Sequence, residues 1–467
     1  MNKTALKKFA ASARTELLNQ IALRAGMFGV TATETGKMTA ATDHVVINNV
    51  EYPQEYKRAY ETLVKQWKQQ GFGQLLEEVA YTWFNRFIAL RFMEVNGYLP
   101  AKIRILSSEN PGQVDPDILL CYQESGLPVD VDRVRTAQQA GDREQAFRLL
   151  LIAQCNELHE IMPFLFEKIN DYTELLLPGS LLHADSVINR LVREVPEEDF
   201  TQVEIIGWLY QYYISEKKNR IVGMNKGAVA KEDLPAATQL FTPQWIVQYM
   251  VQNSLGKLWY EMYPESGLIG EWEYFLKPRT ETEYRREVMP LESIKIIDPA
   301  CGSGHILIYA FDVLYKLYES QGYPVRDIPY LIVENNLYGL DIDKRAAQLA
   351  GFALMMKVRS CSRRLKPVQL HVHEFIDGEQ ISDAALGLFC KDDGEKGQIK
   401  TLVSAFENAK CFGSLIIPPE IDYDWFLQRF EELKPEHVGL IEQAYIYELR
   451  EKLLPVLCKH KCLHRSI

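Results

Sequence analysis

The sequence predicts an α/β fold combined with α-helical parts: a helical N-terminal domain, a partial Rossmann-like domain and a helical C-terminal segment. Two observations predict the α/β domain, because a buried strand twice runs into an acidic residue and then into an amphipathic helix. A third observation predicts the helical domain. Apolar residues recur at helical spacing in Tyr56–Trp67, Leu75–Val95 and Ala146–Ile161.

The chain of 467 residues is longer than one typical core, so we expect several domains. The predicted boundaries are 1–230 for the helical domain, 231–377 for the α/β domain and 378–467 for the remainder. Within the first domain, proline and glycine around 100–128 predict a loop or a short hairpin. In the last domain, the polar residues 378–400 predict a surface loop, and the pattern becomes helical again from Leu402.

Two features of the helical domain admit a nucleic-acid interpretation. Trp208, Tyr210, Tyr212 and Tyr213 precede Lys217, Lys218 and Arg220, and the first helix is basic. Such clusters can stack bases and contact phosphates. A buried aromatic helix face with a solvated basic end is the favoured interpretation, and a solvated helix is favoured for the basic N-terminus.

The α/β domain is expected to open with a capped helix. Thr242 is predicted at the N-cap and Pro243 at the first helical position, which both residue types favour. Apolar residues then recur on one side, so the helix is expected to run to about Leu255.

A glycine turn follows the first predicted strand, Ser293–Ile297. The string Asp298-Pro299-Ala300-Cys301-Gly302-Ser303-Gly304 leads into a helix expected over Ile306–Ser320. Gly302 and Gly304 lack a Cβ, so the backbone can turn sharply and approach a ligand closely. The following helix offers unpaired N–H groups and a partial positive charge, which suit a carboxylate. Asp298, at the strand end, can accept a hydrogen bond from an ammonium group.

This order of strand, D-P-A-C-G-S-G turn and helix resembles the site at which class I methyltransferases hold S-adenosylmethionine. A dinucleotide-binding loop is a poorer match, because G-x-G-x-x-G would require glycine where Leu307 stands.

A second strand and helix follow, at Leu337–Leu340 and Lys344–Val358. Asp341 is placed to bind the two ribose hydroxyls of such a donor, and Ile342 to pack on its adenine. Asp343 is expected to cap the helix. The alternative is that Asp341 also serves only the helix start.

A third strand is expected at Val368–Val372 and ends near Glu374 and Phe375. Glu374 could accept a hydrogen bond from the exocyclic amine of the donor's adenine, with Phe375 beside it. The alternative is that Glu374 is merely a solvated acid after a strand.

Three longer segments of the sequence resemble one protein family. The segments Tyr81–Tyr98, Trp208–Lys218 and Leu234–Pro243 are similar to PglX, the adenine-specific methyltransferase family of BREX phage-resistance systems. The order of a Thr-Pro helix, D-P-A-C-G-S-G and L-D-I-D is that of gamma-class adenine-N6 DNA methyltransferases. The resemblance runs from Met1 to about Val456.

The resemblance implies an activity and a site. The activity is methyl transfer from S-adenosylmethionine to a flipped adenine of double-stranded DNA, in a cytoplasmic phage-defence system with other defence proteins as possible partners. Thr242 and Pro243 would serve the methionine carboxylate of the donor. The other implied cofactor-binding residues are Asp298, Pro299, Ala300, Gly302, Gly304, Asp341, Ile342, Glu374 and Phe375.

The chain departs from the family at the catalytic motif. It contains no Asn/Asp-Pro-Pro-Tyr/Phe tetrapeptide, and Pro418-Pro419 has neither the preceding amide or acid nor the following aromatic. We therefore assign no catalytic residue and no metal, and expect a truncated chain that is inactive alone. Alternatives are a donor-binding or scaffolding protein without turnover and a methyltransferase acting on RNA or protein. Cytosine-C5 chemistry is disfavoured because no Pro-Cys dipeptide occurs.

The last ten residues, Cys458–Ile467, differ in composition from the helix before them. A frameshift or premature stop is the favoured interpretation. A metal knuckle is the less favoured one, because alternating Cys and His do not match known zinc spacings.

Composition limits the remaining classes. The net charge is −11, whereas dedicated DNA-binding chains are more often basic, so the main DNA-contacting surface is expected outside this sequence. Eight irregularly spaced cysteines favour a reducing compartment over a disulfide framework. No apolar run is long enough to span a membrane, and the first residues lack a hydrophobic signal core.

Overall fold

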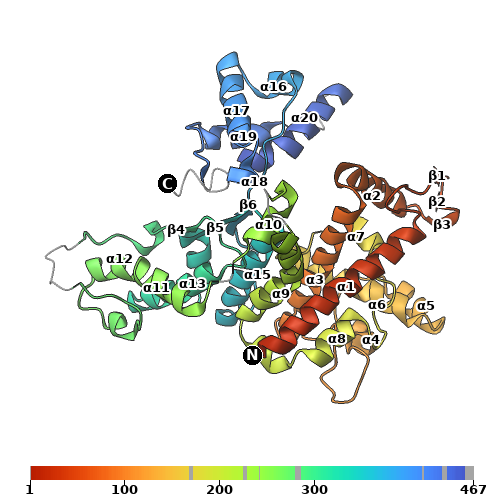
Figure 1. Ribbon diagram of the computed structural model, residues 1–467, viewed down its shortest axis with the longest axis horizontal. Helices are drawn as coiled ribbons and strands as arrows, with labels where there is room; N and C mark the ends of the chain where they lie inside the picture. Colours follow the sequence, from red (N-terminus) through yellow and green to blue (C-terminus); the bar gives the residue numbers. More distant parts are fainter. Residues whose placement is uncertain are drawn as a thin grey trace. The chain divides into compact units, whose positions relative to one another are not determined.

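The computed structural model describes residues 2–167, 172–224, 229–240, 242–278, 286–412, 415–433 and 439–457. The chain forms two compact units. One comprises Met1–Arg220 with Met355–Pro367, and the other comprises Ile221–Leu354 with Val368–Ile467. The described part is mostly helical and contains two small sheets of three strands each (Figure 1).

The first unit is helical apart from one antiparallel sheet. Its helices are α1 (Lys3–Met27), α2 (Tyr56–Gln70), α3 (Phe72–Val95), α4 (Ile118–Cys121), α5 (Val131–Gln139), α6 (Arg143–His159), α7 (Tyr172–Leu175), α8 (Val187–Glu194) and most of α9 (Glu204–Met224). Short 3-10 turns lie at Tyr122–Glu124 and Glu197–Thr201. The three helices predicted here are therefore confirmed as α2, α3 and α6, each shifted by a few residues.

The antiparallel sheet was not expected from the sequence. It comprises β1 (Met38–Ala40), β2 (His44–Ile47) and β3 (Val50–Pro53), in the order β1-β2-β3. Asn48 and Asn49 form the two-residue turn between β2 and β3, with φ of 49° and 64°. Asparagine tolerates this left-handed conformation, which suits the twist of a tight hairpin. Residues 100–128 were predicted to form a loop or a short hairpin. They form a loop that contains α4 and one 3-10 turn but, in this fully described range, no strand, so the loop is confirmed and the hairpin is wrong.

Helix α3 forms the centre of the first unit. Trp83 is fully buried and Phe84 is 1% exposed. The Tyr213 ring of α9 lies 4.3 Å from both the Tyr81 and Phe84 rings, centroid to centroid. Tyr210 and Tyr213 are buried, which confirms a packed aromatic face of α9 at these two residues, whereas Trp208 and Tyr212 are half-buried.

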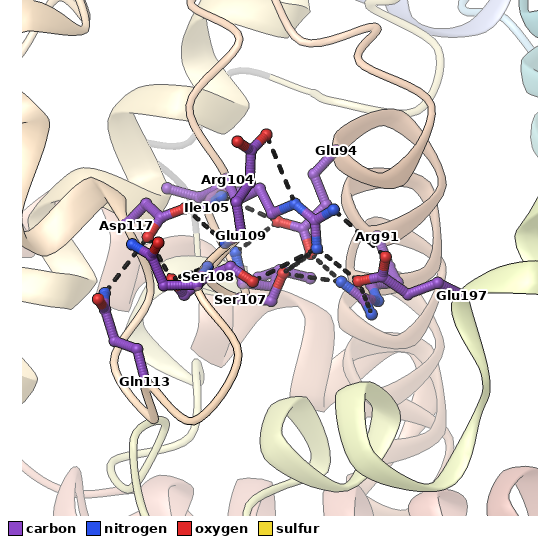
Figure 2. Close-up of polar contacts among 12 residues, drawn as sticks. Arg91, Glu94, Arg104, Ile105, Ser107, Ser108, Glu109, Gln113, Asp117 and Glu197 are labelled. Carbon is purple, nitrogen blue, oxygen red and sulfur yellow. Dashed lines mark hydrogen bonds and ion pairs between the residues drawn. The ribbon is translucent and has the colours of Figure 1, made fainter.

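A buried ionic network fixes the loop that follows α3 (Figure 2). The Glu94 carboxylate accepts hydrogen bonds from the backbone N–H groups of Ile105 and Leu106, at 2.9 and 2.8 Å. It also pairs with Arg91 at 2.7 Å, and both side chains are almost wholly buried. Arg91 reaches Glu197 at 3.0 Å, which Arg104 also contacts. Every charge in the network therefore has an opposite partner.

The second unit carries a parallel sheet. Its strands are β4 (Ile296–Asp298), β5 (Leu337–Asp341) and β6 (His371–Glu374), in the order β4-β5-β6. The helices before and between them are α10 (Leu234–Thr238), α11 (Gln244–Gln252), α12 (Leu255–Met262), α13 (His305–Ser320), α14 (Ile328–Leu331) and α15 (Lys344–Cys361). The last residues of α15, from Met355 onward, belong to the first unit. Helix α13 packs on β4 and β5.

Several expected boundaries in this unit are wrong. The residues before β4 form a 3-10 turn, Leu291–Ser293, so the strand begins later than predicted. Strand β6 also begins later, at His371 rather than Val368. The hydrogen-bonded pairing of β6 with β5 begins only at His371, opposite Tyr338.

The C-terminal helices of this unit are α16 (Asp383–Phe389), α17 (Asp393–Ala405), α18 (Ala409–Phe412), α19 (Tyr423–Glu432) and α20 (Leu440–Lys452). The predicted surface loop over 378–400 is wrong, because it contains α16 and the start of α17. Ala385, Leu386 and Phe389 lie at helical spacing and are buried in a cluster with residues of α17, α19 and α20. The polar residues around them obscured this short pattern.

No helix in the described ranges is long and apolar enough to cross a membrane. Residues Cys458–Ile467, for which a frameshifted tail or a metal knuckle was considered, lie outside the described residues.

Candidate functional site

The candidate site lies where three parallel strands end. Strand register aligns Asp298 with Gly339, and Asp341 with Glu374. Each strand therefore finishes in a carboxylate at the same edge of the sheet, which is the edge where open α/β sheets bind ligands. The structure thus brings together the acidic residues that the sequence singled out.

The turn after β4 depends on two glycines with positive φ. Gly302 has a φ of +53° and Gly304 a φ of +87°. A Cβ on Gly304 would lie 2.9 Å from the Ala350 Cβ of α15, so no larger residue fits there without movement. A Cβ on Gly302 would meet nothing within 4 Å. The Gly302 side of the turn is therefore open to a ligand, whereas the Gly304 side is closed against protein.

A third glycine, on β5, lets the turn pack onto the sheet. A Cβ on Gly339 would lie 2.7 Å from Leu307 Cδ1 and 3.2 Å from Cys301 Sγ. The Cys301 N–H donates to the Leu340 carbonyl oxygen at 2.9 Å. Burial is the main cause that raises the pKa of the Cys301 thiol well above its usual range, and the neighbouring carboxylates raise it further. The thiol therefore stays protonated and acts as a small packing group.

Asp341 ties the turn to the second strand. Its Oδ2 accepts a hydrogen bond from the Gly302 N–H at 2.8 Å, and its Oδ1 accepts one from the Asp343 N–H at 2.8 Å. Both carboxylate oxygens are thus engaged with backbone groups. Because each oxygen can accept more than one hydrogen bond, they retain capacity for ligand hydroxyls.

The site is electrostatically unbalanced. Asp298 is 8% exposed, and its Oδ1 accepts a hydrogen bond from the Ala300 N–H at 3.1 Å. Burial raises the pKa of Asp298 above its ordinary value. The pKa of Asp341 is raised to about 6, mainly by burial and in addition by the carboxylates of Asp343 and Asp298. Within the described ranges neither Asp298 nor Asp341 has an ion-pair partner, so the site favours a cationic ligand.

Asp343 serves the start of α15. Its Oδ1 accepts a hydrogen bond from the Arg345 N–H at 3.0 Å, and its carbonyl oxygen accepts one from the Ala347 N–H at 3.1 Å. These contacts confirm that Asp343 caps the helix, whereas the ribose-binding role of Asp341 stays a prediction. Ile342 lies between them, half-buried against the C-terminal cluster.

At the end of β6, Glu374 is half-buried and Phe375 is 1% exposed. The Phe375 N–H donates to the Asp341 carbonyl oxygen at 2.8 Å. Phe375 lies in the same buried cluster as Leu340 and Phe389. Glu374, the last residue of β6, and Phe375, which follows it, are therefore fixed to the end of β5, but the Phe375 ring belongs mainly to the core.

The helix expected to start at Pro243 begins at Gln244, so Thr242 is not its N-cap as predicted. Pro243 takes the cap position, and its carbonyl oxygen accepts hydrogen bonds from Ile246 and Val247. The helix ends at Gln252 rather than near Leu255, because Asn253 and Ser254 separate it from α12. Thr242 is half-buried and Pro243 exposed, and no hydrogen bond joins the Thr242 side chain to other described residues.

Two buried amides that position the site were missed from the sequence. Gln252, 2% exposed, donates from Nε2 to the Tyr309 hydroxyl at 2.7 Å and thereby joins α11 to α13. Asn336, fully buried, donates from Nδ2 to the carbonyl oxygens of Leu291 and Ile294 at 2.7 and 2.8 Å. The sequence did offer a signal for Asn336, because this asparagine stands directly before the apolar strand β5.

Comparison with known proteins finds a methyltransferase domain in this part of the chain. Residues 279–382, which contain β4, β5, β6 and the glycine turn, match the family model described as the MmeI DNA-methyltransferase domain. The matched range is about the extent of the parallel sheet and its helices.

Relatives match over a much longer range. The adenine-specific methyltransferase BrxX of Escherichia coli strain HS is 40% identical over 98% of this chain and 41% of its own length. The adenine-specific methyltransferase PglX of Lacticaseibacillus casei is 39% identical over 89% of this chain and 38% of its own length. A putative type II restriction enzyme and methyltransferase of Methanocaldococcus jannaschii is 24% identical over 58% of the chain.

These matches confirm the predicted resemblance to PglX-type adenine-specific methyltransferases. The chain spans about two fifths of the length of the BrxX and PglX relatives, at 41% and 38%.

Proposed function

We propose that this chain, similar over nearly all of its length to adenine-specific methyltransferases, is the donor-binding part of a BREX-type DNA adenine-N6 methyltransferase. In this proposal the parallel sheet is a partial class I, Rossmann-like methyltransferase domain, and S-adenosylmethionine is its cofactor. The observation that supports this proposal most is the pair of carboxylates at adjacent strand ends, Asp298 and Asp341, neither of which has an ion-pair partner among the described residues.

The donor's chemistry fits that imbalance. S-adenosylmethionine carries an ammonium and a sulfonium, so it would bring positive charge to a site where burial raises the pKa of both carboxyls. Asp298 would accept a hydrogen bond from the ammonium. Asp341 would accept from the ribose hydroxyls while keeping its hydrogen bonds to Gly302 and Asp343.

The remaining residues would complete the donor site. Pro299, Ala300, Gly302 and Gly304 shape the turn, and its open side at Gly302 allows a ligand to approach the backbone. Glu374 would accept a hydrogen bond from the exocyclic amine of the donor's adenine. Ile342 and Phe375 would support that adenine from the C-terminal cluster. Thr242 and Pro243, at the start of α11, would serve the methionine carboxylate.

When bound, S-adenosylmethionine supplies an electrophilic methyl group. Transfer to adenine needs groups that accept hydrogens from the N6 amine and an aromatic ring that stacks on the flipped base. The Pro418-Pro419 pair does not provide them, because Ile417 precedes it and Glu420 follows it, so it has neither the amide or acid nor the aromatic ring. We therefore propose that this sequence binds the donor and that turnover requires residues it does not contain.

Donor binding is tested by calorimetry with S-adenosylmethionine. Asp298→Asn keeps the hydrogen bond to Ala300 but removes the charge, so affinity should fall about tenfold or more, as expected for loss of a charged hydrogen bond. The matched control is Asp393→Asn, whose side chain is 97% exposed, and its affinity should not change. Equal affinity of wild type and Asp298→Asn, or no binding by either, would refute the donor site.

A methyl-label assay separates this proposal from its alternatives. With tritiated donor, label in the adenines of duplex DNA would show turnover by this sequence alone. Label in RNA or protein would favour a different substrate. Donor binding without transfer to any of them is the result we expect.

A further inference from the structure

Residues 357–366, here called the basic segment, concentrate positive charge in an acidic chain. Five of the ten residues are cationic, and they are Lys357, Arg359, Arg363, Arg364 and Lys366. No Asp or Glu occurs between Asp343 and Glu374, whereas the whole chain carries a net charge of −11. The segment therefore creates a local field opposite in sign to that of the protein.

Arg359 anchors the segment at its start. Its guanidinium lies 4.6 Å from the centroid of the Tyr98 ring. Its Nη1 donates to the Ser362 carbonyl oxygen at 2.7 Å, and its Nη2 to the Gly97 carbonyl oxygen at 3.4 Å. These contacts hold the end of α15 and the following turn to the residues that follow α3, within one compact unit.

The residues that Arg359 contacts, Gly97 and Tyr98, are themselves held in place. Gly97 and Tyr98 begin the loop that the buried ionic network holds, and Glu94 binds the backbone of that loop at Ile105 and Leu106 (Figure 2). A charged segment on a rigid support loses less conformational freedom when it binds than a free one does.

Three of the other four cations lie beyond this anchor. Arg363, Arg364 and Lys366 are exposed and follow Cys361, the last residue of α15. A favourable interaction with the helix dipole acts within the last turn, so it accounts for Arg359 but not for these three. Val358 is fully buried, and Leu365 is half-buried.

We propose that the basic segment contacts the phosphodiester backbone of duplex DNA, a proposal that rests on the DNA substrate of the proposed function. Arginine matches phosphate through its forked donors, and lysine supplies a point charge. A protein partner is less well matched, because protein interfaces centre on apolar and aromatic side chains and the segment exposes none.

The test is fluorescence anisotropy of a short labelled duplex with the whole chain, without methyl donor, between about 50 and 200 mM salt. The variant is Arg363→Ala with Arg364→Ala and Lys366→Ala. The control, Lys37→Ala with Arg58→Ala and Lys68→Ala, removes the same charge from exposed positions on and near α2. Thermal unfolding of both variants checks that each is folded.

Three lost phosphate contacts should reduce the slope of log affinity against log salt by about 2–3 and weaken binding about tenfold or more, while the control keeps the wild-type slope. Equal losses in both variants, no loss in either, or no duplex binding by wild type would overturn the proposal. So would displacement of the duplex by poly-glutamate as effectively as by unlabelled DNA. Failure of donor binding would refute the donor site without altering this salt dependence, so the two proposals fail separately.

Discussion

Replacement of Gly304 by alanine should destabilise the second unit more than the same change at Gly302. Both glycines have positive φ, and the left-handed conformation costs an L-residue about 1 kcal/mol. Only at Gly304 does the new Cβ also collide, at 2.9 Å from the Ala350 Cβ. Overpacking of this kind costs about 1–3 kcal/mol. We therefore expect a loss of about 2–4 kcal/mol for Gly304→Ala and about 1 kcal/mol for Gly302→Ala.

The assay is urea unfolding, read by hydrogen exchange of peptides from α13 so that the second unit alone is observed. A second variant isolates the collision. Ala350→Gly removes the opposing Cβ at its own cost of about 1 kcal/mol in a helix interior. It should restore about 1 kcal/mol or more when combined with Gly304→Ala, as a coupling between contacting residues. Equal costs at the two glycines, with additive behaviour of the Ala350 pair, would refute the packing argument.

Three further predictions follow from the charges and amides. Donor affinity should be constant near neutral pH and fall as the pH drops through about 6, because Asp341 has a pKa of about 6 and loses its charge when protonated; calorimetry across this range measures it, and a flat profile down to pH 5 would contradict it. Glu94→Ala should cost about 3–5 kcal/mol by leaving Arg91 without its buried partner, whereas Glu109→Ala, 70% exposed, should change stability by less than about 1 kcal/mol; similar denaturant midpoints for the two would count against the network. Asn336→Ala leaves the Leu291 and Ile294 carbonyl oxygens without their donor, so the protein should lose about 1–3 kcal/mol of stability, measured by thermal unfolding. Asn336→Asp also lacks the amide donor and should not restore this stability.

The sequence predicted the position and conformation of the glycine turn well because the constraints on this turn are local. The turn needs glycine where φ is positive, and an acid at the end of a strand is visible in the order of residues. The association of Asp298, Asp341 and Glu374 also followed from the sequence, because parallel strands place their carboxyl ends at one edge.

Features that depend on distant contacts were predicted poorly. Gly304 is required partly by Ala350, which lies on another helix, and nothing near Gly304 in the sequence indicates that contact. Helix α16 was taken for a surface loop because its few apolar residues become a recognisable core face only when α17, α19 and α20 pack around them. The start of α11 was misplaced by one residue because Pro243 satisfies the cap position without a side-chain hydrogen bond.

The basic segment shows a different limit. The five cations of the segment are visible in the sequence. Only the structure shows that Arg359 is anchored on Tyr98, whereas Arg363, Arg364 and Lys366 are exposed. The net charge of −11 is a sum over the whole chain and therefore does not reveal a local basic segment.

The most direct test of the donor site is hydrogen exchange of the whole chain with and without S-adenosylmethionine. The account predicts that the donor slows exchange in peptides covering residues 298–304 and 341–343, because the ligand would bind backbone groups of the glycine turn and stabilise the Asp341 contacts to Gly302 and Asp343. Protection confined to peptides outside the parallel sheet, or no protection at saturating donor, would contradict it.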